Sequence, residues 1–145
     1  MTALTDLDTP VVTVDLDIMR ENIRRVQAHL SRYGIGNRPH IKTHKIPEIG
    51  KMQMAAGAVG ITCQKLGEVE VFAAAGVADD VLLTYNILGP AKTERLMALA
   101  ARVPRLTAVL DNEVVAGELG EAARRGQRTL PFLIECDTGF RRTGV

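Results

Sequence analysis

Runs of β-branched and other apolar residues alternate with amphipathic helical patterns along almost the whole chain. The alternation recurs every ~20 to 26 residues, the length of a strand, a helix and two short loops. The expected strands cover residues 11–16, 38–42, 59–64, 80–86, 106–111 and 129–137, and the expected helices cover residues 17–33, 47–56, 66–75, 90–102 and 113–125. Such strict alternation predicts an α/β fold with a parallel sheet, either a closed barrel or an open doubly wound sheet.

The absence of glycine-rich nucleotide-binding patterns favours the barrel. Neither G-x-G-x-x-G nor G-x-x-x-x-G-K follows any expected strand, although open sheets that bind nucleotides usually carry one of them. A complete barrel has eight strands and typically ~250 residues, whereas this chain has 145 residues. We therefore expect a partial barrel, with its chemistry at the carboxyl ends of the strands.

Charge and hydropathy exclude several classes of partner. The 18 basic residues are balanced by 17 acidic ones, so nothing in the net charge indicates nucleic acid or an anionic membrane surface. No apolar run approaches the ~18 residues of a membrane span, and the N-terminus lacks a secretory signal pattern. Cys63 and Cys136 lie far apart and are expected to be buried thiols. We expect a cytoplasmic protein that binds a small molecule.

Residues 38–42 put polar side chains on one face of an expected strand. Because strand side chains alternate, Arg38, His40 and Lys42 share a face. If Ile41, on the other face, packs against a helix, then His40 and Lys42 point into the barrel. A lysine held partly out of water near other cations would suit a nucleophile or a Schiff base. The alternative is an edge strand with one solvated face, or lining charges that pair with one another, and the residues alone leave both open.

Polar residues also follow the other expected strands. They are Thr62, Gln64, Thr84, Asn86, Asp111, Asn112, Glu135 and Asp137. In a barrel they would converge on one site, but such residues are also common turn formers and helix caps. Capping is the favoured interpretation for Asp111, Asn112 and Asp137. For Gln64 and Asn86, a role in the site and a role in a turn or cap are about equally supported.

Four further basic residues lie close to the expected site. Lys45 is expected to face solvent near a helix start, and His44 is expected to be a rim residue or a ligand contact. Arg141 and Arg142 are adjacent in sequence, so at most one of them is expected to reach the site.

Three segments together resemble a known family. Residues 8–22 contain D-T-P, V-D-L-D and a following asparagine, residues 38–45 read R-P-H-I-K-T-H-K, and residues 60–65 read G-I-T-C-Q-K. They resemble the D-threonine aldolase and eukaryotic-type D-serine dehydratase family, which belongs to the alanine racemase-like, fold-type III pyridoxal phosphate enzymes. The resemblance implies a partial (β/α)8 TIM-type barrel, truncated before its last strands and the C-terminal β-domain. Residues 1–16 would then be a strand of that β-domain, and residues 17–145 the N-terminal part of the cofactor-binding barrel.

The resemblance also implies roles for individual residues. Lys42 would form the Schiff base with pyridoxal phosphate. Residues 137–144 resemble the alanine racemase segment D-T-G-x-x-R-x-G, whose arginine contacts the phenolic oxygen of the cofactor, and Arg142 matches it. Glu135 stands where many alanine racemases have a lysine, which argues against a racemase. His40, Gln64 and Asn86 complete the expected cofactor-binding residues.

The activity implied by the resemblance is that of a pyridoxal phosphate-dependent lyase acting on D-β-hydroxy-amino acids. Retro-aldol cleavage of D-threonine-like substrates to glycine and an aldehyde is slightly preferred. The alternatives are a D-serine dehydratase, which forms pyruvate and ammonia, and a non-catalytic pyridoxal phosphate-binding barrel. A divalent metal (Mn, Mg or Zn) with ligands outside this chain and a homodimer of the full-length protein are also implied. The 145-residue chain alone is expected to be inactive.

Overall fold

The structure, a computed structural model, describes residues 3–145. Its helices are α1 (Leu16–Arg32), α2 (Pro47–Ala55), α3 (Leu66–Ala74), α4 (Pro90–Ala100) and α5 (Glu113–Arg125). Its strands are β1 (Ile61–Cys63), β2 (Asp80–Leu83), β3 (Arg105–Leu110) and β4 (Phe132–Ile134). Two short 3-10 turns, η1 (Leu4–Asp6) and η2 (Ile41–Thr43), precede α1 and α2.

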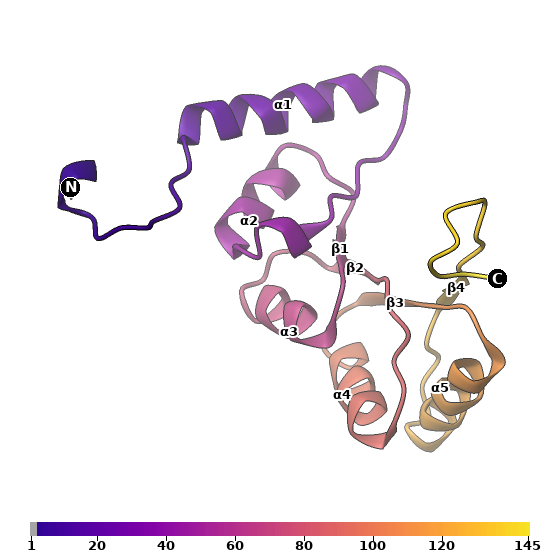
Figure 1. Ribbon diagram of the computed structural model, residues 1–145. Coiled ribbons are helices and arrows are strands. Elements are labelled where there is room, and N and C mark those ends of the chain that lie inside the picture. The colour runs from indigo at the N-terminus through magenta and orange to yellow at the C-terminus, as the bar shows by residue number, and fades with distance from the viewer. Residues whose placement is uncertain (1–2) are drawn as a thin grey trace.

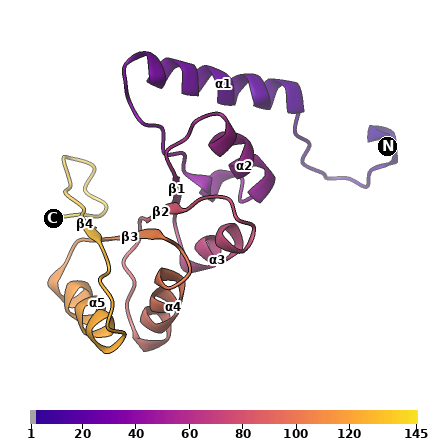
Figure 2. The ribbon, with the colours of Figure 1, turned by 180° about the vertical axis from the view of Figure 1, so that it is seen from behind.

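The four strands form one parallel sheet in the order β1-β2-β3-β4. Val81 of β2 pairs with Leu106 of β3, and Ala108 of β3 pairs with Phe132 of β4. Helices α3, α4 and α5 follow one another along one side of this sheet, as the two opposite views in Figures 1 and 2 show. The arrangement confirms the predicted alternation of parallel strands with covering helices.

The hydrophobic core lies between the sheet and these helices. Its strand residues are Ile61, Cys63, Val81, Leu83, Leu106, Ala108 and Leu110. Thr62, Leu82 and Thr107 alternate with them and therefore lie on the opposite face of the sheet. Phe72 of α3 and Leu96 of α4 complete the core and are almost fully buried. The predicted strand alternation thus directs the apolar residues towards the helices.

The strand expected at residues 38–42 is reduced to a single bridge, in which His40 pairs with Thr62. Pro39 has no N–H to donate to a ladder, and the His40 ring then accepts a hydrogen bond from the backbone N–H of Lys42 at 3.3 Å. This bond caps η2 and turns the chain away from the sheet. Ile41 is nevertheless fully buried in the core, as its predicted packing requires.

The strand expected at residues 11–16 is absent from the structure. The chain is irregular up to Asp15, whose carboxylate caps α1 by accepting from the backbone N–H groups of Asp17 and Ile18. A strand needs a neighbour for its backbone hydrogen bonds, and no strand pairing involves this segment within residues 3–145. The assignment of residues 1–16 to a second domain stays a prediction, and residues 1 and 2 lie outside the described part.

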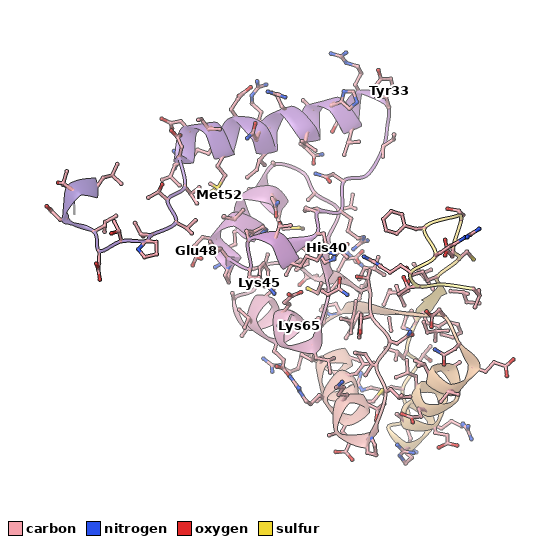
Figure 3. All side chains as sticks on the ribbon, viewed as in Figure 1. Tyr33, His40, Lys45, Glu48, Met52 and Lys65 are labelled. Atoms are coloured by element: carbon pink, nitrogen blue, oxygen red, sulfur yellow. The ribbon has the colours of Figure 1, made fainter. Side chains whose placement is uncertain are left out.

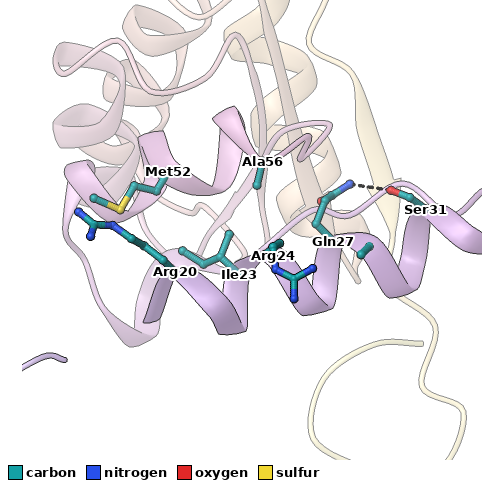
Figure 4. Close-up of a pocket in the computed structure, with 8 residues that line it drawn as sticks. Arg20, Ile23, Arg24, Gln27, Ser31, Met52 and Ala56 are labelled. Carbon is teal, nitrogen blue, oxygen red and sulfur yellow. Dashed lines mark hydrogen bonds between the residues drawn. The ribbon is translucent and has the colours of Figure 1, made fainter. Parts of the chain in front are cut away.

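Helix α1 lies across α2, away from the sheet (Figure 1). Ile23 faces α2 and lines a shallow groove with Met52 and Ala56 (Figure 4). Ile18 and Val26 of the same helix are more than half exposed. Within residues 3–145, no helix combines the length and the apolar character that crossing a bilayer requires.

Candidate active site

A hollow of about 640 Å³ lies at the carboxyl ends of the strands. It is lined by His40, Lys42, Gln64, Thr84, Tyr85, Asn86, Glu135, Arg142 and Thr143. These residues come from η2 and its N-cap and from the segments that follow β1, β2 and β4. The structure therefore brings together Lys42 and the four other residues predicted from the sequence as cofactor-binding.

Lys42 is held beside Gln64. Its Nζ donates to Gln64 Oε1 at 3.4 Å, and Gln64 Nε2 in turn donates to the carbonyl oxygen of Thr84 at 3.5 Å. The backbone N–H of Gln64 donates to Glu68 Oε2 at 2.7 Å. Lys42 itself is exposed, so the expectation that this lysine is partly buried is wrong for the structure described. Its side chain extends from η2, beyond the edge strand β1, where few atoms cover it.

His40 lines the hollow, and its two ring nitrogens have different surroundings. Because Nδ1 accepts the hydrogen bond from the backbone of Lys42, the proton of the neutral ring resides on Nε2. Burial, together with the nearby charge of Lys42, lowers the pKa of His40. Nε2 is buried and makes no hydrogen bond within residues 3–145. The ring is thus a neutral donor without an acceptor.

Asn86 is oriented by Asp111. Asn86 Nδ2 donates to Asp111 Oδ1 at 2.7 Å, and the backbone N–H of Gly144 donates to Asp111 Oδ2 at 3.0 Å. Bonds from Gly144, Asn112 and Asn86 lower the pKa of Asp111. The predicted capping role of Asp111 is wrong, because this carboxylate ties the segment after β2 to the last loop. The oxygen of the same amide, Asn86 Oδ1, is buried and has no hydrogen-bond partner among the described residues.

The neighbouring polar residues are divided between caps and turns. Asn112 Oδ1 accepts from the backbone N–H of Val115 at 3.0 Å, which confirms its prediction as the N-cap of α5. Asp137 accepts from Gly139 and Phe140, each at 2.7 Å, and so closes a turn rather than capping a helix. The hydrogen bond from Gly139 is the main reason that the pKa of Asp137 is lowered.

The last loop carries Arg142 to the hollow. Its guanidinium carbon lies 5.9 Å from the centroid of the Phe140 ring. Arg141 adopts a φ of 54° and does not line the hollow, in agreement with the prediction that at most one of the two arginines reaches it. Thr143, which the sequence did not single out, donates from Oγ1 to Glu135 Oε1 at 2.7 Å.

The other predicted basic residues lie elsewhere. Lys45 does not simply face solvent, because its Nζ lies 2.8 Å from Glu68 Oε1; Figure 3 labels it in the segment between His40 and α2. His44 is half-buried near the Phe72 ring rather than at the rim. Arg38 lies at the amino end of the sheet, where it pairs with Asp80 at 2.7 Å.

Glu68 is a further residue that sequence reasoning missed. It is only 5% exposed, although it stands in the first turn of α3, where an acidic residue is usually a solvated helix-start signal. Burial raises its pKa, but the bonds from Lys45 and Gln64 outweigh burial and the net pKa is lowered. Glu68 is therefore a buried carboxylate next to the candidate site.

The cysteines differ from each other. Cys63 is buried in the core, where desolvation and the nearby Glu68 charge raise the pKa of its thiol to about 12. Cys136 is exposed, which corrects the prediction that both thiols are buried. β4 and its flanking residues lie at the edge of the sheet, so no further strand covers this thiol in the structure described.

Comparisons with known proteins agree with this architecture. The family model of the alanine racemase N-terminal domain matches residues 14–145. A D-threonine aldolase from Arthrobacter sp is 37% identical over 142 residues, which are 98% of this chain and 37% of that relative. A D-threo-3-hydroxyaspartate dehydratase from Delftia sp. (strain HT23) is 36% identical over 142 residues, again 98% of this chain and 37% of the relative.

The same relationship holds in three dimensions. The crystal structure of D-threonine aldolase from Filomicrobium marinum superposes with a TM-score of 0.92 at 37% identity, covering 98% of this chain and 38% of that one. The chain thus spans little more than a third of the length of these relatives. The matches confirm the resemblance and the barrel fold class predicted from the sequence.

Proposed function

This chain belongs to the family of the alanine racemase N-terminal domain, and from that premise we propose that it supplies the cofactor-binding lysine of a pyridoxal phosphate-dependent lyase. The proposed reaction is retro-aldol cleavage of D-threonine-like β-hydroxy-amino acids to glycine and an aldehyde. The observation that supports it is the position of Lys42 in a hollow shared with Gln64, Asn86 and Arg142. We also propose that the full-length protein is a cytoplasmic homodimer.

The residues of the hollow fit pyridoxal phosphate. His40 Nε2 and Asn86 Oδ1 are buried without partners among residues 3–145, and such orphan atoms are rare in native structures unless a ligand or water satisfies them. Arg142 would offer a positive charge to the phenolic oxygen of the cofactor, and Lys42 would offer the primary amine for covalent attachment. The volume of about 640 Å³ falls within the range typical of cofactor pockets.

The chain's own groups then have separate tasks. When bound, the pyridinium ring supplies an electron sink for charge that develops at the substrate α-carbon. Lys42 Nζ, held at Gln64 Oε1, is positioned to carry a proton within the hollow. The neutral His40 ring would donate to the bound cofactor from Nε2, and Asn86, fixed by Asp111, would accept at Oδ1.

The divalent metal implied by the resemblance finds no site in the described residues. Within residues 3–145, no three His, Cys, Asp or Glu side chains are grouped so that they could hold a metal ion.

Borohydride reduction of the full-length protein loaded with pyridoxal phosphate tests the lysine assignment. Peptide mass mapping should place a single pyridoxyl group on Lys42. A pyridoxyl group on Lys45 instead, or on neither lysine, would overturn the proposal. Lys42→Ala provides the control, since it removes the amine while leaving the buried Ile41 in place.

Product analysis distinguishes cleavage from dehydration, which is the second candidate because a dehydratase is 36% identical to this chain. With D-threonine, cleavage of the α–β carbon bond yields glycine and acetaldehyde, whereas loss of the hydroxyl yields a 2-oxo acid and ammonia. We expect glycine from D-threonine and none from L-threonine. A 2-oxo acid as the main product, or pyruvate from D-serine, would assign the chain to the dehydratases.

A further inference from the structure

Two lysines three positions apart have different surroundings. Lys42 Nζ contacts a neutral acceptor, Gln64 Oε1, at 3.4 Å. Lys45 Nζ lies 2.8 Å from the carboxylate of Glu68, whose side chain is 5% exposed while that of Lys45 is 53% exposed. Only one of the two amines is therefore tied to a buried charge.

Glu68 has both carboxylate oxygens engaged. Oε1 accepts from Lys45 Nζ, and Oε2 accepts from the backbone N–H of Gln64 at 2.7 Å. A buried carboxylate is stable only when it is paired and fully hydrogen-bonded. One side chain thus holds Lys45 with one oxygen and, with the other, the residue that contacts Lys42.

The backbone at Lys45 supports the same arrangement. Lys45 has a φ of 56°, in the left-handed region that residues with a Cβ seldom adopt. Its backbone N–H donates to the carbonyl oxygen of Ile41 at 2.8 Å, which closes the turn. The side chain consequently pairs with α3 and does not line the hollow.

We propose that Glu68 is a positioning residue that selects Lys42 over Lys45 as the amine that bonds to the cofactor. An amine must reach the aldehyde carbon within the hollow before it can attack. Glu68 Oε1 holds the Lys45 amine in an ion pair against α3, outside the hollow, while Oε2 anchors Gln64 so that its side chain holds Lys42 in the hollow. The inference rests on the proposed function, because it concerns the attachment of pyridoxal phosphate.

The test compares the labelling of both lysines in the full-length protein after removal of its cofactor. Added pyridoxal phosphate bonds through its aldehyde carbon to the lysine nitrogen with loss of one water, and borohydride then delivers hydride to the carbon–nitrogen double bond. Peptide mass mapping gives the yield at each lysine, normalised to exposed Lys92. We expect Glu68→Gln to raise Lys45 labelling roughly tenfold, the worth of one charge-assisted hydrogen bond at a half-exposed amine, and to lower Lys42 labelling.

Glu70→Gln is the matched control. It removes a carboxylate from the same helix, where Glu70 pairs with Arg95 at 2.8 Å on an exposed surface, and it should leave the normalised yields unchanged. If Glu68→Gln only destabilised the fold, all lysines would become more exposed alike. The ratio of labelling at Lys45 to labelling at Lys92 would then not change. Glu68→Asp, which keeps the charge, should restore much of the protection of Lys45.

Acetylation of the native wild-type protein provides a measurement that needs no variant. Lys45 should react roughly tenfold more slowly than Lys92 although its side chain is half-exposed. Equal rates, or unchanged labelling in Glu68→Gln while the wild type is labelled at Lys42, would overturn this inference and leave the proposed function intact. A wild type labelled at neither lysine would overturn the proposed function itself.

Discussion

The amide of Asn86 is satisfied at one end only. Its nitrogen donates to Asp111, whereas its oxygen has no partner among residues 3–145. Asn86→Ala should therefore weaken pyridoxal phosphate binding by about tenfold, the worth of one hydrogen bond in a polar site. Absorbance titration of the full-length protein measures the affinity. Asn37→Ala is the control, since the Asn37 side chain donates to Gln27 and does not line the hollow, and equal losses in both variants would contradict the prediction.

Asp80 gives the amino end of the sheet a pH dependence. The hydrogen bond from Arg38 is the main reason that its pKa is held below the ordinary 3.8, and Arg105 contributes a second bond. A lowered folded-state pKa means that the stabilisation is fully present above the unfolded value and is lost as pH falls through the folded one. We expect Asp80→Asn to lower the free energy of unfolding by about 1 kcal/mol at neutral pH.

Urea unfolding at neutral and acidic pH checks this prediction. The difference between wild type and Asp80→Asn should shrink in acid, because the wild-type carboxyl is then protonated in both states. Arg105→Gln should give a smaller loss, since its side chain is 68% exposed. A difference that stays constant with pH would show that the ion pair is not its source.

Among the helices, α5 has a clearly defined start. Asn112 caps it, and Val115, Leu119 and Ala122 bury its inner face. Asn112→Ala should reduce the free energy of unfolding by about 1 kcal/mol, the usual value of an N-cap. Thermal or urea unfolding measures the loss. Asn112→Asp retains a capping oxygen and should be nearly neutral; a similar loss in both variants would contradict the capping role.

Helices were predictable from the sequence, and strands were less so. The expected helices at residues 66–75 and 113–125 agree with α3 and α5 to within one residue at each end, because apolar stripes and glycine or proline at the ends are local signals. The strand expected at residues 38–42 was lost to Pro39 and to capping by His40. At residues 11–16, strand formation depends on a pairing partner, which no local pattern encodes.

The candidate site was predictable where it depends on strand ends. Lys42, Gln64, Asn86 and Arg142 were expected to converge, and they line one hollow. The ion pair between Lys45 and Glu68 joins residues 23 positions apart, and the bond from Gly144 to Asp111 joins residues 33 apart. Such pairings arise from the tertiary fold, so the residue types alone gave no indication of them.

At the scale of the whole molecule, β4 is an open edge. Phe132, Leu133 and Ile134 are all more than half exposed, and edge strands with apolar side chains tend to pair with other chains. The 145-residue chain produced alone should therefore self-associate, and Leu133→Lys should reduce this. Light scattering measures the effect. Val114→Lys, at an exposed apolar position on α5, is the control and should change little.

The core and the hollow occupy different parts of the sheet. Apolar side chains such as Val81 and Leu106 hold the strands to the helices, while Gln64 and Asn86 stand on connections past the strand ends. Substitutions on these connections are expected to have little effect on folding. The chain is about equally similar to an aldolase, at 37% identity, and to a dehydratase, at 36% identity. A scaffold built in this way would tolerate a change of reaction without a change of core.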